Sequence, residues 1–330
     1  MLDDSGASFS AVRLPRSILK FAGILVVGVC SAQFAPRFGP GSTSAPRGPG
    51  HLIRIEEGHI IDEDAVRTAR ETTSHSAETP TWENPPEFKG DVFTFARVIF
   101  QSEARPGPGT SLGRRLGWWV DYPDADLNFS YRLQQMTSIR TDPDARVLRL
   151  TDPDVFRFPL LYMEHAGYIA LSDEEVVILR NFLTGGGALF VNDFWGQHEW
   201  EGFAREIARV LPGRQWIDLD MDHPIFHCVY DLQGPMNRMQ IPTMQFWNES
   251  RDPNDPNSPL QRVFRGEGSE EMHVRALLDA QQRIVILAIH NSDVSDGWER
   301  EAENEHYFNE FSEKVAYPLG INIIVYLMTH

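Results

Sequence analysis

One segment near the middle of the chain constrains the fold more than any other. A helical pattern over residues 176–183 ends at the glycines 185–187, and a short apolar run over 188–192 follows at once. A helix joined so closely to a buried strand is typical of a sheet covered by helices. Asp193 and Trp195 stand where this strand should end. In open α/β sheets, ligands bind beyond the carboxyl ends of the strands, so we expect both side chains to take part in binding or catalysis.

Helical and apolar patterns alternate along the rest of the chain. This alternation predicts a mainly parallel sheet with helices on both faces, forming an α/β domain over residues 91–330. A polar stretch without periodicity, 235–268, predicts a long loop that serves as a lid or an insertion, or is disordered. The predicted strands cover 92–100, 147–150, 160–163, 188–192, 215–219 and 283–290, and the helices 124–137, 172–183, 199–211 and 311–328.

The N-terminal residues 1–32 have the pattern of a signal peptide. Basic residues precede an apolar run over 21–32 that is too short to span a bilayer comfortably, and cleavage after Ala32 is expected. A lipoprotein site at Cys30 and an uncleaved membrane anchor are the alternatives. We therefore expect an exported protein, periplasmic or extracellular, with no membrane span after cleavage. Residues 33–90, rich in Pro, Gly and Ser in their first part, predict a flexible linker with one short helix over 60–70.

Charge and cysteine content exclude some functions. The net charge of -17 argues against nucleic acid, which needs a basic surface, and suits cationic or neutral ligands. Without Cys30, Cys228 is the one thiol left, so no intramolecular disulfide is expected. Its apolar surroundings in sequence are typical of a buried small side chain rather than a nucleophile.

Two strand ends provide the leading candidates. Asp193 with Trp195 would suit a sugar ring or a metal, although Asp193 could instead cap the helix that starts near residue 197. His290 and Asn291 follow the predicted strand 283–290 and should emerge at the same edge of the sheet. A general base paired with a carboxylate would have this pattern, and so would a hydrogen-bonded loop.

An acidic cluster begins just after Trp119. Asp121 precedes an Asp-x-Asp-x-Asn pattern over residues 124–128, which Asn128 completes; the pattern is similar to part of a calcium loop but lacks its glycine and distal glutamate. Capping of the following helix is the favoured role for Asp124, and Asp126 could act in the same way. The roles of Asp121 and Asn128 stay open.

The histidines at 223 and 227 are the candidates for a metal pair. The i, i+4 spacing of His223 and His227 would place both rings on one face of a helix. Pro224 fits this only in a first turn, and a third ligand must come from elsewhere, so a structural turn is the stronger interpretation. Many tryptophans lie near predicted loops, which suggests carbohydrate stacking, although large aromatic residues also fill cores. They are residues 118, 119, 195, 200, 247 and 298.

The chain from about residue 93 to the end resembles a bacterial family catalogued as domain of unknown function 4159. Four blocks carry the resemblance: WVDYPDADLNFS at 119–130, GALFVNDFW at 187–195, DHPIFH at 222–227 and YPLGINIIVYLMTH at 317–330. That family is in turn similar to the class I glutamine-amidotransferase-like fold, a flavodoxin-type parallel sheet. Enzymes of that fold carry a cysteine on the turn that corresponds to residues 191–196, where this chain has none. We therefore do not expect glutamine amidotransferase activity.

These observations lead to two functional hypotheses. The first is a non-catalytic ligand- or partner-binding module of the cell envelope, for a glycan or a protein, without a cofactor. The second is a carbohydrate-directed or metal-assisted hydrolase that uses the strand-end pair of Asp193 and His290; a divalent metal is the alternative to having no cofactor. The catalytic candidates are Asp193, His290 and Asp121; the ligand-binding candidates are Asp193, Trp195, Asn128, Trp119 and Asn291; the metal candidates are His223 and His227. The oligomeric state is left open.

Overall fold

The computed structural model describes residues 52–54, 60–74, 78–88, 90–102, 117–250 and 267–330. The chain divides into Met1–Arg47, outside these residues, and a compact unit over Gly48–His330. The predicted signal peptide, the first part of the predicted linker and residues 251–266 of the predicted long loop also lie outside the described residues.

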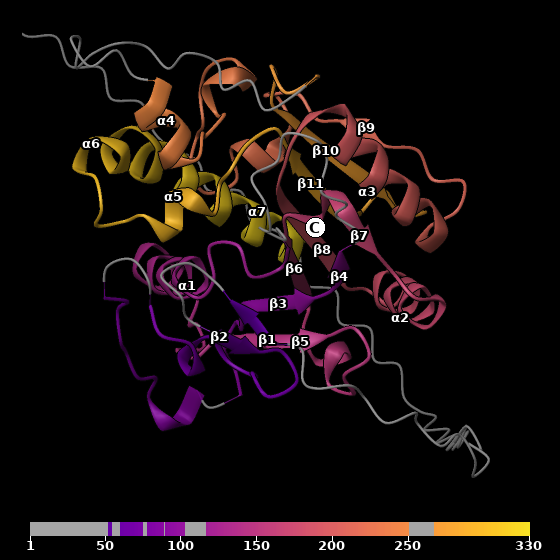
Figure 1. The fold of residues 1–330 in the computed structure, drawn as a ribbon, viewed down its shortest axis with the longest axis horizontal. Helices are drawn as coiled ribbons and strands as arrows, with labels where there is room; N and C mark the ends of the chain where they lie inside the picture. Colours follow the sequence, from indigo (N-terminus) through magenta and orange to yellow (C-terminus); the bar gives the residue numbers. More distant parts are fainter. Residues whose placement is uncertain (1–51, 55–59, 75–77, 89, 103–116, 251–266) are drawn as a thin grey trace, which may run out of the picture. The chain divides into compact units, whose positions relative to one another are not determined.

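A seven-stranded sheet forms the centre of the described structure (Figure 1). Its five parallel strands, in spatial order, are β5 (Arg146–Arg149), β3 (Ala96–Ile99), β6 (Leu160–Glu164), β8 (Ala188–Phe194) and β11 (Ile284–His290). The antiparallel strands β10 (His273–Leu278) and β9 (Ile217–Asp218) extend the edge beyond β11. Two small sheets pair β1 (Leu52–Arg54) with β2 (Ile60–Asp62), and β4 (Gln101–Ser102) with β7 (Ile169–Ala170).

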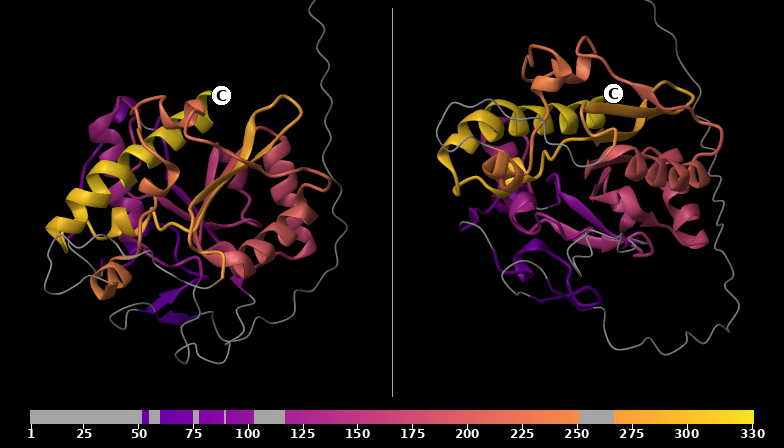
Figure 2. Two further views of the ribbon diagram at one scale, coloured as in Figure 1. Left: turned by 90° about the horizontal axis from the view of Figure 1, so that it is seen from above. Right: turned by 45° about the horizontal axis from the view of Figure 1, so that its top comes forward.

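Helices cover both faces of this sheet, as Figure 2 shows from above. On one face lie α2 (Asp173–Thr184) and α3 (Gly196–Val210), which contact each other. The other face carries α1 (Asp124–Met136), α5 (Asp296–Glu299) and α7 (Tyr317–Thr329), and a π-helical segment, Phe308–Ala316, leads into α7. The short helices α4 (Met244–Ser250) and α6 (Glu305–Tyr307) lie at the periphery in Figure 1. The predicted α/β architecture is confirmed.

Local sequence signals account for the helix–strand unit that constrained the prediction. The Ser172 hydroxyl accepts a hydrogen bond from the Glu175 backbone N–H at 3.2 Å, and the Glu175 carboxylate accepts from the Ser172 N–H at 2.8 Å. This reciprocal capping box starts α2, and Gly185 ends it. All seven residues of β8 are buried, as expected for a strand between two parallel neighbours.

Several predicted boundaries differ from the structure. The predicted helix over residues 60–70 is wrong: the segment forms β2 and a single 3-10 turn, Ala69–Glu71. Strand β10 falls in a stretch that showed no clear pattern, and it pairs with β11 through backbone hydrogen bonds. Strand β8 runs two residues further than predicted, to Phe194. Asp193 therefore lies inside the strand rather than after its end.

The part of the predicted linker that the structure describes packs against the sheet domain. Ile61, Val66 and Ala69 are at most 5% exposed, and the Ala69 N–H donates to the Asp144 carbonyl at 2.9 Å. Apolar side chains buried in this way belong to the core rather than to a tether. The compact unit therefore begins before residue 91. Among the described helices, none is both long and apolar enough to cross a membrane.

Candidate functional site

The carboxyl ends of the parallel strands carry unusual backbone conformations. His165 follows β6 with a φ of 52°, Asp193 is the second-last residue of β8 with 50°, and Asn291 follows β11 with 63°. Asp121, just before α1, has a φ of 57°. Left-handed conformations are uncommon for residues other than glycine and cluster at functional sites. Their gathering around this edge of the sheet marks it as the candidate site.

Asp193 joins β6 to the start of α3. Its Oδ2 lies 3.0 Å from His165 Nδ1, and its Oδ1 accepts a hydrogen bond from the Trp195 indole N–H at 2.6 Å. All three residues are at most 3% exposed. Asp193 does not cap α3, because the N-cap residue is Trp195, whose N–H donates to Glu199 at 2.8 Å. The predicted pair of Asp193 and Trp195 is therefore in direct contact, but inside the protein.

His290 belongs to a different hydrogen-bonding network. Its Nδ1 lies 3.0 Å from Arg275 Nη1, and its Nε2 lies 3.0 Å from the Gly196 carbonyl oxygen. A guanidinium can only donate, so Nδ1 accepts and Nε2 carries the hydrogen. Burial, the largest cause, lowers the pKa of His290 to about 3. Asp193 and His290 thus use separate partners and do not form the predicted acid–base pair.

Asn291 acts as a brace at the same edge. Its side-chain oxygen accepts from the Gly196 N–H at 2.8 Å, and its amide donates to the carbonyls of Gly268 and Glu271 at 2.8 and 2.7 Å. All three hydrogen bonds of the Asn291 side chain are therefore made with backbone atoms. The geometry therefore gives Asn291 a structural role in holding the start of α3.

A cluster of buried carboxylates lies beside Asp193. Oxygens of Asp121, Glu164 and Asp293 all lie within 4.8 Å of one another, and so do those of Asp121, Asp296 and Glu299. Each of these side chains is at most 8% exposed. Glu164 ends β6, Asp293 follows β11, and α5 supplies Asp296 and Glu299. The first of these two triads, Asp121, Glu164 and Asp293, is called the carboxylate triad below.

The triad residues resist ionisation. Desolvation by burial, then repulsion from Asp296 and Asp193, raises the pKa of Asp121 to about 7. Burial and the charges of Asp121 and Asp193 raise the pKa of Glu164 well above its ordinary value. Burial and the charge of Asp193 do the same for the pKa of Asp293. Like charges crowded in a low-dielectric site account for all three shifts.

Nearby cations are already engaged by other acids. Arg97 on β3 donates through Nε to both oxygens of Asp126, at 2.9 and 3.0 Å, and through Nη1 to the backbone carbonyls of Trp118 and Val120. Arg300 lies 3.2 Å from Asp296 and 2.6 Å from Glu299. The second acidic group, with Asp296 and Glu299, is therefore partly neutralised by Arg300. The ion pairs of these two arginines leave the carboxylate triad without a directly bound positive charge in the described part of the chain.

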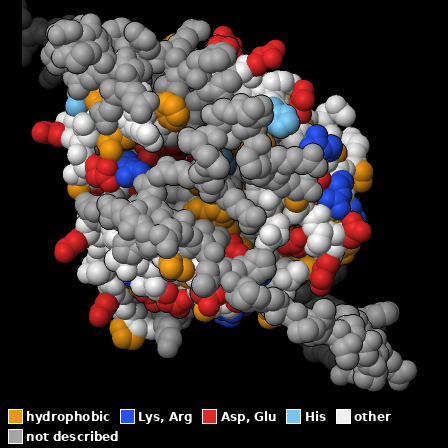
Figure 3. Space-filling view, in the orientation of Figure 1, with side chains coloured by type: hydrophobic (Ala, Val, Ile, Leu, Met, Phe, Trp, Pro, Cys, Tyr) orange, Lys and Arg blue, Asp and Glu red, His pale blue; other side chains and the backbone are white. Residues whose placement is uncertain are grey.

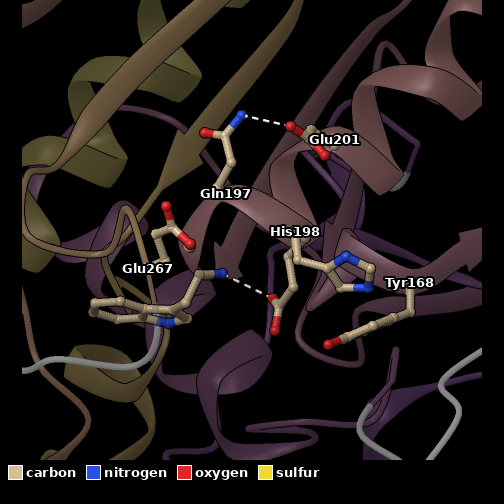
Figure 4. Close-up of a pocket in the computed structure, with 8 residues that line it drawn as sticks. Tyr168, Gln197, His198, Glu201 and Glu267 are labelled. Carbon is tan, nitrogen blue, oxygen red and sulfur yellow. Dashed lines mark hydrogen bonds between the residues drawn. The ribbon is translucent and has the colours of Figure 1, made fainter. Parts of the chain in front are cut away.

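A cavity of about 470 Å³ opens where α3 begins. Figure 4 shows His198 beside Tyr168, with Glu267 across from them and Gln197 hydrogen-bonded to Glu201. The aromatic rings of Tyr168 and His198 lie 5.7 Å apart. The described residues that line the cavity include three glutamates but no Lys or Arg: Tyr168, Trp195, Gly196, Gln197, His198, Glu199, Glu201 and Glu267.

The structure places the other candidates away from this edge or in the core. His223 and His227 flank a 3-10 turn, Pro224–Phe226, rather than sharing a helix face. His223 Nδ1 accepts from the Ile225 N–H at 3.2 Å, and the ring nitrogens of His227 each lie 2.6 Å from an oxygen, of Asp231 and of Met221. These contacts support the structural turn that the sequence also allowed.

The acidic helix start and the tryptophans are mainly structural. The Asn128 amide donates to the Trp298 carbonyl at 2.9 Å, and Asp126 pairs with Arg97 instead of capping α1. Trp119 is partly buried against Trp118. Four of the predicted stacking tryptophans are at most 4% exposed: Trp118, Trp195, Trp247 and Trp298.

Most residues of the acidic cluster are not predicted by the sequence patterns. Of its residues, Asp121 was a candidate, whereas Glu164, Asp296 and Glu299 were not. Glu164 directly follows four apolar residues at the end of a predicted strand, the same signal that singled out Asp193. Asp296 and Glu299 had no such signal in the sequence, because the short helix α5 that carries them is separated from β11 by a turn.

The fold and the site together define an α/β domain in which the carboxyl ends of the parallel strands gather left-handed backbone conformations and buried acidic side chains. The chain matches the model of a domain of unknown function (DUF4159) over residues 108–328. This match covers most of the chain, so the protein belongs to the DUF4159 family. No curated protein matches it.

Proposed function

We propose that the protein is a non-catalytic binding module whose ligand is a small organic cation held in the cavity at the start of α3. The observation that carries the proposal is the composition of that cavity: Glu199, Glu201 and Glu267 line it, and its described lining residues include no Lys or Arg. Carboxylates and aromatic faces together favour ammonium groups. The volume of about 470 Å³ is in the range of small-ligand sites.

The same cavity is less suited to a neutral sugar. The Trp195 ring is 3% exposed, and its N–H is taken by Asp193, so it offers little stacking surface. Acidic side chains are also scattered over the visible surface in Figure 3, in keeping with the net charge of -17. These features favour a cationic ligand over the envelope glycan that the sequence alone suggested.

Two further parts of the proposal concern ancestry and location. The five parallel strands, numbered along the chain, lie in the order 2-1-3-4-5, which is the flavodoxin-type order and supports a relationship with the amidotransferase-like fold. The end of β8 and the residues that follow it, 191–196, carry Asp193 and Trp195 and no thiol, which argues against glutamine hydrolysis. The sequence of residues 1–32 supports export to the cell envelope.

Titration with putrescine and spermidine, followed by calorimetry and thermal unfolding, tests the proposed ligand class. Binding of either amine should raise the melting temperature of the full chain, because a ligand that binds only the folded state stabilises it. Glu201→Gln and Glu267→Gln should each weaken binding about tenfold. Glu310→Gln changes an exposed glutamate outside the cavity and should leave binding unaltered. Equal binding by all variants, or none by the wild type, would refute the proposal.

A metal-assisted hydrolase is the second candidate function. The buried carboxylate cluster favours it, since enzymes of this type hold their metal with such groups. The separate hydrogen bonds of Asp193 and His290 count against the acid–base pair first suggested for it. Turnover of a glycoside or ester by the metal-loaded protein, lost on Asp121→Asn, would favour this candidate over the binding module.

A further inference from the structure

We propose that the carboxylate triad of Asp121, Glu164 and Asp293 binds one hard divalent cation, of the Ca²⁺, Mg²⁺ or Mn²⁺ class. The proposal does not depend on the organic cation assigned to the cavity. It rests on the position of the triad in the fold, the spacing of its oxygens and a buried oxygen without a partner.

The position is the one where an α/β sheet is built to hold a ligand. Strand β3 lies between β5 and β6, so the chain runs outward from it in both directions, and the crevice at this reversal is the usual ligand site. Glu164 ends β6 at this place, and Asp121 comes from the segment that precedes α1. Asp293 reaches it from the turn after β11. Three separate segments thus converge on one point.

The spacing of the oxygens fits a single ion. The three carboxylate oxygens lie within 4.8 Å of one another. Oxygens that ligate one Ca²⁺ or Mg²⁺ lie about 2.0 to 2.6 Å from the ion, so two of them can be no more than about 5 Å apart. An all-oxygen set selects hard cations over Zn²⁺ or Cu²⁺, which prefer nitrogen and sulfur.

The second observation is an oxygen that has no hydrogen-bond partner. Asp121 Oδ2 is buried and has no hydrogen-bond partner among the described residues, and the residue is only 8% exposed. A buried, unsatisfied carboxylate oxygen costs free energy that a bound cation would recover. Other oxygens of the triad are oriented by fixed donors: the Tyr162 hydroxyl donates to Glu164, and the Ser295 hydroxyl and Asp296 N–H donate to Asp293. Such supporting hydrogen bonds are typical of metal ligands.

Charge balance points the same way. Arg97 and Arg300 are bound to Asp126, Asp296 and Glu299, while Asp193 adds a further acid beside the triad. Within the described residues, the triad therefore has no positive charge bound to it directly, and a divalent ion would balance its negative charge.

Manganese titration of the full chain tests the site directly. Metals are first removed from the protein with a chelator. The electron paramagnetic resonance signal of free Mn²⁺ should then stay absent until one Mn²⁺ has been added per chain. Added Mg²⁺ or Ca²⁺ should restore the signal by displacing the bound Mn²⁺. Asp121→Asn and Asp293→Asn should each weaken Mn²⁺ binding by about tenfold or more, because ligand charge sets affinity. Glu313→Gln, which alters an exposed glutamate, controls for weak binding to the acidic surface.

Thermal unfolding shows whether the variants are folded. Metal-free Asp121→Asn should melt at or above the temperature of the metal-free wild type at pH 8, because it removes one buried charge from a repulsive group. Wild type and Glu313→Gln should gain stability with Mn²⁺, and Asp121→Asn should not. The proposal fails if the wild type binds none of the three ions at about 1 mM, which is the Kd of the weakest calcium sites in proteins. It also fails if Asp121→Asn binds Mn²⁺ as well as the wild type. In either case the triad holds protons only. Amine binding to the cavity would be unaffected by that result.

Discussion

At the scale of single residues, His290 illustrates how a buried histidine is kept neutral. Arg275 donates to its Nδ1, and its Nε2–H donates to the Gly196 carbonyl, so the neutral ring satisfies both contacts. A proton on Nδ1 would face the guanidinium without an acceptor. Burial, with the charge of Arg275 as a further cause, therefore keeps the pKa of His290 at about 3. The residue anchors the start of α3 instead of acting as a base near neutral pH.

This arrangement predicts a pH dependence of stability. The folded pKa of His290 is depressed from 6.5 to about 3, so the unfolded chain binds the proton first. Its contribution to stability is full above pH 6.5 and is lost as the pH falls towards 3. At about 1.4 kcal/mol per pKa unit, roughly a few kcal/mol are at stake. Urea unfolding at intervals from pH 4 to 7 measures it.

The neutral variant His290→Gln separates this effect from other titrations. The glutamine amide keeps a donor and an acceptor but cannot be protonated in this range. The variant should lose less free energy of unfolding between pH 7 and pH 4 than the wild type. His306→Gln, at an exposed site outside this hydrogen-bonding network, serves as the matched histidine control. Parallel pH profiles for the wild type and His290→Gln would show that His290 titrates normally.

At the scale of elements, the sequence predicted what local patterns encode. The capping box at Ser172 and the glycines after residue 184 predicted α2 and β8 correctly. The sequence did not predict β10, because this strand depends on its pairing with β11, which is a tertiary contact. The helix over residues 60–70 was predicted from local pattern alone, which does not show that β2 pairs with β1. Tertiary contacts routinely override local propensity.

The same distinction applies to the candidate site. Asp193 and Asp121 were found because each stands at the end of an apolar or aromatic run. The convergence of Glu164 and Asp293 with Asp121 depends on which strands are neighbours, and sequence periodicity does not reveal strand order. Whether a polar strand-end residue faces a ligand or braces a helix, as Asn291 does, is likewise decided by packing.

The packing of α7 on α1 and α5 gives a prediction at this scale. A Cβ on Gly320 of α7 would lie 2.6 Å from Trp298 Cζ2 and 2.7 Å from Phe129 Cε2. These two buried rings lie 4.3 Å apart and leave little room to move. Gly320→Ala should therefore cost about 1 to 3 kcal/mol through overpacking, more than the helix gains from alanine.

Thermal unfolding monitored by circular dichroism measures this cost. Gly320→Ala should lower the melting temperature by about 2 to 8 °C. Met328→Ala lies on the same helix at 43% exposure and should change stability by about 0.5 kcal/mol or less. An unchanged or higher melting temperature for Gly320→Ala would mean that α5 shifts freely against α7, and α5 carries Asp296 and Glu299.

At the scale of the whole molecule, the segment before residue 91 belongs to the folded unit that contains the site. Glu63 accepts a hydrogen bond from the Trp118 indole, and the Thr68 carbonyl accepts one from the Tyr122 hydroxyl at 2.9 Å. Trp118 and Tyr122 are fully buried and stand on either side of Asp121 in sequence. The N-terminal segment thus helps to hold the strained residue that supplies one arm of the carboxylate triad.

Truncation tests this coupling between the N-terminal segment and the site. A chain that starts at Asp91 loses the buried Ile61, Val66 and Ala69, together with the partners of Trp118 and Tyr122. It should melt at least about 5 °C below a chain that starts at Gly48, and its tryptophan emission should shift to longer wavelength as Trp118 meets water. Asp121 lies between Trp118 and Tyr122 in sequence, and the truncation would expose both aromatic residues. Mn²⁺ binding should therefore weaken along with stability. Equal melting temperatures and equal Mn²⁺ affinities for the two chains would show that residues 60–74 cover the domain without supporting it, and that Asp121 is held by α1 and the strand ends alone.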